Sequence, residues 1–234
     1  MYTRVSTWIV VLFALVGGVR AEWNPPAKVS RAEIIQASKT VLAMPDIALK
    51  AGEEISRIDV AKLDWDIAAI VYQPEDAAKI PVGADGKKIG VFLLHGGAGD
   101  FRSMDTVARL LAGKFGVKVV SMTYPGNLYL LDPSRNWPGD TIHPDGTVRT
   151  PIWNKDKPIT LDQYELREDK SMLERYGTHI LACAKEGTEF YNRMGAYFMA
   201  FEEGAKDLMR RHFPEATYSI YIHGHSTGGP FSLC

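Results

Sequence analysis

The sequence predicts an α/β fold built on a mostly parallel β-sheet, and three neighbouring segments carry that prediction. Residues 90–94 are a continuous apolar run of the kind buried in a parallel sheet, and residues 117–122 are expected to form the next strand. Between them, residues 104–115 carry apolar side chains at helical spacing, and Gly116 ends the pattern. This order predicts a right-handed crossover that brings the carboxyl ends of both strands to one edge of the sheet.

Two further strands are expected before this unit, at residues 55–63 and 66–73, and they predict an antiparallel start to the sheet. Upstream of them, Ser30 and Glu33 have the spacing of a capping box, so we expect a short helix that runs from there to about Ala43. Pro45 follows and stops that helix.

A second long helix is expected over residues 195–212, followed by a strand at residues 218–222. The strand is short and rich in β-branched and aromatic side chains. The helix has apolar residues at helical spacing and a basic last turn that favours the negative end of the helix dipole. The apolar positions are Phe198, Phe201, Ala205, Leu208 and Met209.

The strand at residues 218–222 leads into Gly224-His225-Ser226-Thr227-Gly228, a G-x-S-x-G pattern. In a nucleophile elbow this pattern places a serine on a sharp strand-to-helix turn, with glycines where the strained backbone packs too closely for side chains. The pattern also arises by chance, so its position directly after a predicted strand is what favours an elbow.

A second glycine-rich segment, His95-Gly96-Gly97-Ala98-Gly99, follows the strand at residues 90–94. Glycines at this place allow backbone N–H groups to approach a substrate. In acyl transfer such donors, together with the N–H of the residue after the nucleophile, hold the oxyanion of the tetrahedral intermediate. The alternative is a plain glycine-rich turn.

The two motifs, in this order and each after a strand, resemble the α/β-hydrolase family, in particular its esterases and lipases with an HGGG-type oxyanion loop. The resemblance covers roughly residues 60–234. It implies that Ser226 is the nucleophile, that Thr227 donates one oxyanion N–H, and that Gly96 or Gly97 donates the other. Ala98 stands where the fuller motif has a third glycine, so the choice between these two donors stays open.

The resemblance implies a serine hydrolase that acts on small carboxylic esters through an acyl-enzyme, without a cofactor. A peptidase or an acyltransferase of the same fold is one alternative, because the elbow does not distinguish ester from amide or water from another acceptor. A non-catalytic remnant or binding protein that keeps the serine as part of a turn is another.

The family's acid and base follow the serine in chain order, and the residues after Ser226 include neither. We therefore expect residues 55–234 to form a partial hydrolase domain that lacks the C-terminal half of its sheet and is nearly inactive as written. The alternative is a rearranged triad that uses one of the six earlier histidines, which are His95, His143, His179, His212, His223 and His225.

A long segment rich in proline, tryptophan and charge, residues 124–193, leaves the strand end beside the predicted site. We expect a cap or lid there, with Tyr124, Trp137 and Trp153 lining the substrate pocket. A surface excursion whose aromatic side chains pack on the body of the domain is the alternative.

The N-terminus has a short basic start, an apolar stretch and a small-residue end, which predicts a signal peptide at residues 1–21 with cleavage after Ala21. The apolar stretch is shorter than the about twenty residues that span a bilayer, although an uncleaved anchor is the alternative. We expect a secreted or periplasmic protein in which residues 22–54 form an N-terminal helix and linker. After export, Cys183 and Cys234 could pair, and the sequence leaves this open.

The charges nearly cancel, with 27 Lys and Arg against 28 Asp and Glu, and no long block of like charge occurs. This balance gives no indication of a nucleic acid or an anionic membrane surface as partner. No cluster of cysteine and histidine has metal-ligand spacing, so we expect no metal site. The expected partner is a small ester substrate, and the oligomeric state stays open.

Overall fold

The structure, a computed structural model, describes residues 28–97, 99–126, 152–154, 156–157, 159–169 and 179–233. The chain divides into two compact units, residues 1–43 and 44–234. In the first unit, helix α2 spans Arg31–Ala43. The Ser30 N–H donates to Glu33 Oε2 at 2.7 Å and the Glu33 N–H donates to Ser30 Oγ at 3.2 Å, so the expected capping box is confirmed. The expected signal peptide lies outside the described residues and stays a prediction.

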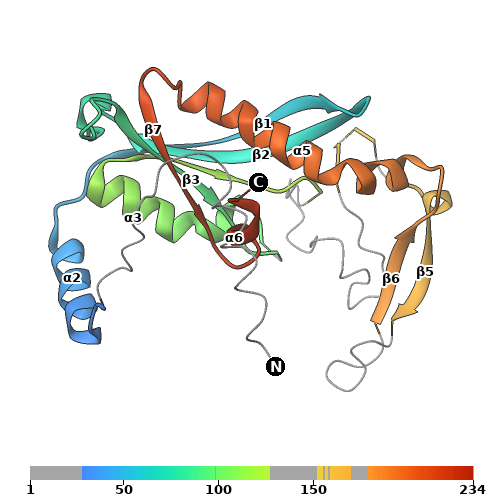
Figure 1. Cartoon of the computed structure of the whole chain (residues 1–234), viewed down its shortest axis with the longest axis horizontal. Coiled ribbons are helices and arrows are strands. Elements are labelled where there is room, and N and C mark those ends of the chain that lie inside the picture. Colours follow the sequence, from blue (N-terminus) through green and yellow to red (C-terminus); the bar gives the residue numbers. More distant parts are fainter. Residues whose placement is uncertain are drawn as a thin grey trace, which may run out of the picture. The chain divides into compact units, whose positions relative to one another are not determined.

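The second unit is an α/β structure around a five-stranded mixed sheet with the strand order β1-β2-β4-β3-β7 (Figure 1). Strand β2 runs antiparallel to both of its neighbours, whereas β4, β3 and β7 are parallel to one another. All strands except β2 therefore point the same way, as expected for a mostly parallel sheet with an antiparallel start. The strands are β1 (Leu49–Val60), β2 (Leu63–Pro74), β3 (Lys88–Leu94), β4 (Lys118–Met122) and β7 (Tyr218–Gly224).

Strands β1 and β2 form one long hairpin, and its turn lies earlier than the sequence suggests. The chain reverses at Ala61 and Lys62, whose φ angles are 55° and 60°. The two expected strands left residues 64–65 between them, but both residues are in β2. Trp65 is fully buried and its indole N–H donates to the Val60 carbonyl at 3.2 Å, which draws the start of β2 into the sheet.

The sheet carries a hydrophobic core on each face, because successive residues of a strand point to opposite sides. On one face, Phe92 and Leu94 of β3 pack in a cluster with helix α5 (Glu189–His212). On the other face, Leu93 packs in a cluster with helix α3 (Asp105–Phe115) and the 3₁₀ turn Phe101–Met104 before it. In Figure 1, α5 and α3 are accordingly seen on different sides of the sheet.

Helix α3 confirms the crossover between β3 and β4, but its buried face differs from the expected one. Ala108 and Ala112 are fully buried, whereas Val107 and Phe115 remain 39% and 42% exposed. Small side chains on the inner face let the helix approach the sheet closely, so the helix packs on the sheet through its alanines. Gly116 ends the helix at φ +71°, as expected.

Helix α5 begins before its expected start at Gly195. Thr188 caps it, with its Oγ1 accepting from the Tyr191 N–H at 3.3 Å. Phe201, Ala205 and Leu208 are buried as the spacing predicts, but Phe198 is 65% exposed.

The expected insertion, residues 124–193, contains regular structure as well as the start of α5. Strands β5 (Tyr164–Asp169) and β6 (His179–Ala184) form an antiparallel pair, preceded by the 3₁₀ turn Leu161–Gln163. Earlier in the insertion, the Trp153 carbonyl accepts from the Asp66 N–H of β2 at 2.8 Å. The cap or lid role stays a prediction, because residues 127–151 lie outside the described residues.

Candidate active site

Ser226 lies on a strained turn between β7 and the short helix α6 (Gly228–Phe231). Its φ angle is +54°, a value that residues other than glycine rarely adopt. The turn is closed by hydrogen bonds from the Gly228 N–H to the His225 carbonyl at 2.9 Å and from the Gly229 N–H to the Ser226 carbonyl at 3.0 Å. Ser226 itself is exposed. This is the backbone geometry that the elbow pattern predicts, and the role of Ser226 as a nucleophile stays a prediction.

The glycines around Ser226 are required by close backbone contacts. A Cβ atom on Gly224 would lie 2.0 Å from the Gly228 carbonyl oxygen, and one on Gly228 would lie 2.4 Å from the Leu94 carbonyl oxygen. By contrast, a Cβ atom on Gly229 would meet nothing within 4 Å. Strand β7, helix α6 and the end of β3 are therefore packed backbone against backbone.

The loop after β3 lies against the elbow, as the parallel pairing of the two strands predicts. Leu94 is opposite Gly224 in the sheet, and the His225 N–H donates to the Leu94 carbonyl at 2.9 Å. A Cβ atom on Gly96 would lie 3.4 Å from Ser226 Cβ, and one on Gly97 would lie 3.0 Å from Thr227 Oγ1. The structure thus brings Gly96, Gly97, Ser226 and Thr227 together. Their roles in catalysis stay predictions.

His95 is fully buried under this loop, and its hydrogen bonds identify its protonation state. Its Nδ1 lies 2.6 Å from the Gly96 carbonyl oxygen, which can only accept. The Tyr124 backbone N–H, which can only donate, lies 3.4 Å from its Nε2. The ring is therefore neutral with its proton on Nδ1. Burial lowers the pKa of His95 to about 4, so this neutral form persists at ordinary pH.

None of the described histidine side chains forms an acid–base pair with Ser226. Both ring nitrogens of His95 have partners, Nδ1 at the Gly96 carbonyl and Nε2 at the Tyr124 N–H. His212 bonds through Nε2 to Glu54 at 2.9 Å, beyond the other end of β7, while His223 and His225 are exposed. The His225 ring lies against the glycine loop, with its Cδ2 3.6 Å from the position that a Cβ atom on Gly96 would take.

The three residues expected to line a substrate pocket lie in different surroundings. Tyr124 is 2% exposed and packs on His95 with ring centroids 4.1 Å apart. Trp153 is 1% exposed and meets Trp65 edge to face at 5.3 Å. Trp137 lies outside the described residues. Substrate contact by these residues stays a prediction, and the burial of Tyr124 and Trp153 does not favour it.

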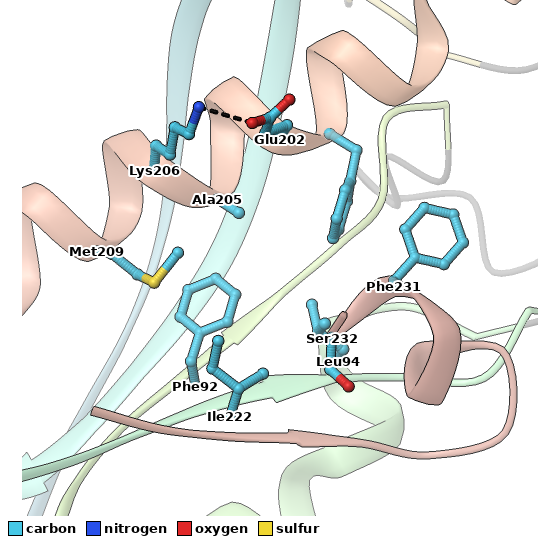
Figure 2. Close-up of a pocket in the computed structure, with 10 residues that line it drawn as sticks. Phe92, Leu94, Glu202, Ala205, Lys206, Met209, Ile222, Phe231 and Ser232 are labelled. Atoms are coloured by element: carbon cyan, nitrogen blue, oxygen red, sulfur yellow. Dashed lines mark ion pairs between the residues drawn. The ribbon is translucent and has the colours of Figure 1, made fainter. Parts of the chain in front are cut away.

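An apolar cavity of about 110 Å³ lies behind the elbow, between α5, the sheet and α6 (Figure 2). Figure 2 shows Phe92 and Ile222 on one side and Met209 and Ala205 of α5 on the other, with the ion pair of Lys206 and Glu202 at its edge. Ser226 is not among its lining residues. The cavity is therefore not assigned to the substrate.

A buried ion-pair cluster fastens the insertion to β2, and sequence patterns did not indicate it. Arg193 of α5 is 2% exposed, donates to the Asp64 carbonyl at 2.7 Å and pairs with Glu189 at 2.5 Å. Its guanidinium also lies 5.0 Å from the Trp65 ring. Asp66, equally buried, pairs with Arg57 at 2.8 Å. The contacts of Arg193 with Asp64 and Trp65 hold α5 on β2, and the pair of Asp66 and Arg57 joins β2 to β1.

Within the described segments, no three histidine, cysteine or acidic side chains gather as a metal site would require. The helices that the structure describes include none with the length and apolarity needed to cross a membrane. Cys183 lies on β6, and Cys234 lies outside the described residues, so their pairing stays a prediction.

No protein-family model and no curated protein matches the sequence. Among solved structures, the chain is similar to a structure of an arylesterase, with 19% sequence identity and a TM-score of 0.23 over 51% of this chain. The chain spans 35% of the length of that arylesterase chain. A similarity of this extent establishes neither fold nor activity, so a function has to be argued from the residues around Ser226.

Proposed function

We propose that Ser226 is the nucleophile of a serine hydrolase that cleaves carboxylic esters through an acyl-enzyme. The observation that carries this proposal is the positive φ of an exposed serine whose neighbour across the fold is the glycine loop after β3. A strained serine beside backbone that can approach a carbonyl is the arrangement that acyl transfer needs. We also propose, on the same grounds, that the five-stranded unit is of the α/β-hydrolase type.

In the proposed reaction, the Oγ of Ser226 attacks the ester carbonyl carbon, and the carbonyl π electrons move to oxygen. The N–H of Thr227 and that of Gly96 or Gly97 hold the resulting oxyanion. When the carbonyl re-forms, the alcohol leaves and the acyl group stays on Ser226. The proton of Ser226 passes to water or a buffer base, because none of the described histidines forms an acid–base pair with Ser226, and we therefore expect slow acylation.

An ester is favoured over an amide by the chemistry of the leaving group. An amine leaves only after a general acid has protonated it, whereas an activated alcohol leaves as an anion. Because the described residues hold no histidine–carboxylate pair beside Ser226, they support the less demanding of the two reactions.

The test is acylation by p-nitrophenyl acetate, with p-nitroacetanilide as the amide counterpart and Ser226→Ala as the control. The proposal predicts one acetyl group on the peptide that contains Ser226 and nitrophenol release above the spontaneous rate, and neither of these in the alanine variant. Acetylation of other residues alone, or an unchanged yield in Ser226→Ala, would contradict it. Acylation by the amide at a similar rate would instead favour the peptidase alternative.

A further inference from the structure

Tyr124, in the segment after β4, is in contact with both halves of the candidate site. We propose that Tyr124 is a positioning residue that fixes the loop of His95, Gly96 and Gly97 relative to the elbow. The inference rests on the proposed function, because the loop matters only where it holds an oxyanion. Tyr124 acts through other residues and is not expected to touch substrate, since its side chain is 2% exposed.

The first contact is made by the hydroxyl group of Tyr124. It donates to the His95 carbonyl oxygen at 2.6 Å, in a fully buried position. Burial raises the pKa of this hydroxyl well above its usual value, so it remains a donor throughout the ordinary pH range. The His95–Gly96 peptide, which carries the Gly96 N–H, is thereby held in one orientation.

The second contact passes through the His95 ring. The Tyr124 N–H donates to His95 Nε2, and His95 Nδ1–H donates in turn to the Gly96 carbonyl oxygen. That oxygen also accepts from the Gly99 N–H at 3.0 Å. In a trans peptide the N–H points opposite to the carbonyl, so fixing the Gly96 carbonyl fixes the direction of the Gly97 N–H.

The third contact joins Tyr124 to the elbow. Its ring stacks on Phe231 of α6, with centroids 4.8 Å apart and planes 20° apart. Phe231 also packs edge to face on Phe201 of α5 at 4.5 Å. One side chain thus bridges the glycine loop and the helix that directly follows Ser226. Oxyanion donors act most strongly when their positions are fixed before the reaction, and this bridge supplies such fixation.

The variant that tests the inference is Tyr124→Phe, which removes the hydroxyl and keeps the stacked ring. Tyr72→Phe is the matched control. Tyr72 is fully buried and its hydroxyl donates to Asp105 Oδ1 at the same distance of 2.6 Å, but it belongs to the core on the α3 side of the sheet. A general loss of one buried hydrogen bond would therefore affect both variants alike.

Two measurements are made on the full chain. The first is amide hydrogen exchange at Gly96 and Gly97, followed by NMR, which requires no activity. The second is phosphonylation of Ser226 by a fluorophosphonate. Its rate is measured over a range of probe concentrations, which gives the maximal rate and the half-saturating concentration separately. For Tyr124→Phe we expect about tenfold faster exchange at Gly96, because its peptide loses the hydroxyl contact. The change at Gly97 should be smaller, because the variant keeps the backbone N–H that donates to the His95 ring. We also expect an at least about tenfold lower maximal rate, with the half-saturating concentration unchanged. In Tyr72→Phe both values should stay within twofold, roughly the scatter expected away from the site.

Wild-type exchange and rates in Tyr124→Phe would overturn the inference, as would equal changes in both variants. Failure of the proposed function has a different signature, which is no adduct at Ser226 in the wild-type chain or an undiminished yield in Ser226→Ala. In that event the exchange measurement alone decides whether Tyr124 fixes the loop.

Discussion

The β1–β2 turn and the elbow share an unusual backbone conformation but differ in what surrounds it. Among the described residues, those with positive φ that are not glycine are Ala61, Lys62 and Ser226. Ala61 and Lys62 are exposed and reverse the chain between two long paired strands. The backbone on either side of Ser226 is closely packed, so that no side chain fits at Gly224 or Gly228.

The difference indicates what each strained conformation is for. At the hairpin, the pairing of β1 and β2 offsets the strain, and both turn residues are exposed. At the elbow, the close contact of β3, β7 and α6 imposes the strain and presents an exposed hydroxyl beside Gly96. Strain that the surrounding structure imposes at one exposed nucleophilic side chain is what an active site would require.

The largest expected effect comes from breaking the backbone contact at the elbow. Gly228→Ala should destabilise the fold by about 3 kcal/mol or more, because the added Cβ would meet backbone atoms that cannot rotate away. Gly229→Ala, one residue on and with open space around its Cβ position, is the matched control and should lie within about 0.5 kcal/mol of wild type. Urea unfolding measures both, and equal stabilities would show that the elbow is not closely packed.

The second expected effect is a pH dependence of stability, which arises from His95 beside the elbow and has no counterpart at the hairpin turn. The folded-state pKa of His95 is about 4 and its ordinary value is 6.5, so the unfolded chain binds the extra proton between these values. The contribution of His95 to the free energy of unfolding is therefore fully present above pH 6.5. It is lost as the pH drops toward 4, by up to roughly 3 kcal/mol in total.

The measurement is urea unfolding across this pH range in the wild-type chain and in His95→Asn, which cannot titrate. Other groups contribute equally to both, so the difference between the two curves isolates His95. Parallel curves would contradict the buried neutral histidine.

The smallest expected effect is the relief of backbone strain when glycine replaces a residue with positive φ. Both regions should gain a similar stability, but only the change at the elbow should abolish acylation. Lys62→Gly and Ser226→Gly should each raise the free energy of unfolding by about 1 kcal/mol, since glycine adopts positive φ without a steric penalty. Lys62→Gly should keep the acylation at Ser226, whereas Ser226→Gly has no hydroxyl to acylate. A destabilised Lys62→Gly would show that the hairpin turn carries a contact of its own.

Several elements could be predicted from sequence because their signals are local. Ser30 and Glu33 are three residues apart, and the runs before His95 and before Gly224 are short, apolar and followed by glycine. The meeting of Gly96 with Ser226 then followed from the parallel pairing of their strands.

The features that sequence reasoning missed depend on contacts between distant segments. The sequence Ala61-Lys62 does not indicate a turn, because it contains none of the residues that favour positive φ. The register of β1 on β2 imposes the turn there. Arg193 appears as an ordinary helix-surface charge until Asp64 and Trp65 cover it. Tyr124 likewise suggests a pocket wall, and only its contacts with His95 and Phe231 indicate a positioning role.

The central claim is that the folded elbow, and not the serine by itself, makes Ser226 reactive. The most direct measurement treats the chain with a fluorophosphonate in buffer and again in concentrated urea, then maps the modified serines by peptide mass. We predict one adduct in buffer, at Ser226, that disappears in urea. Labelling of Ser226 to the same extent in both conditions, or labelling in buffer spread over several exposed serines, would contradict the claim.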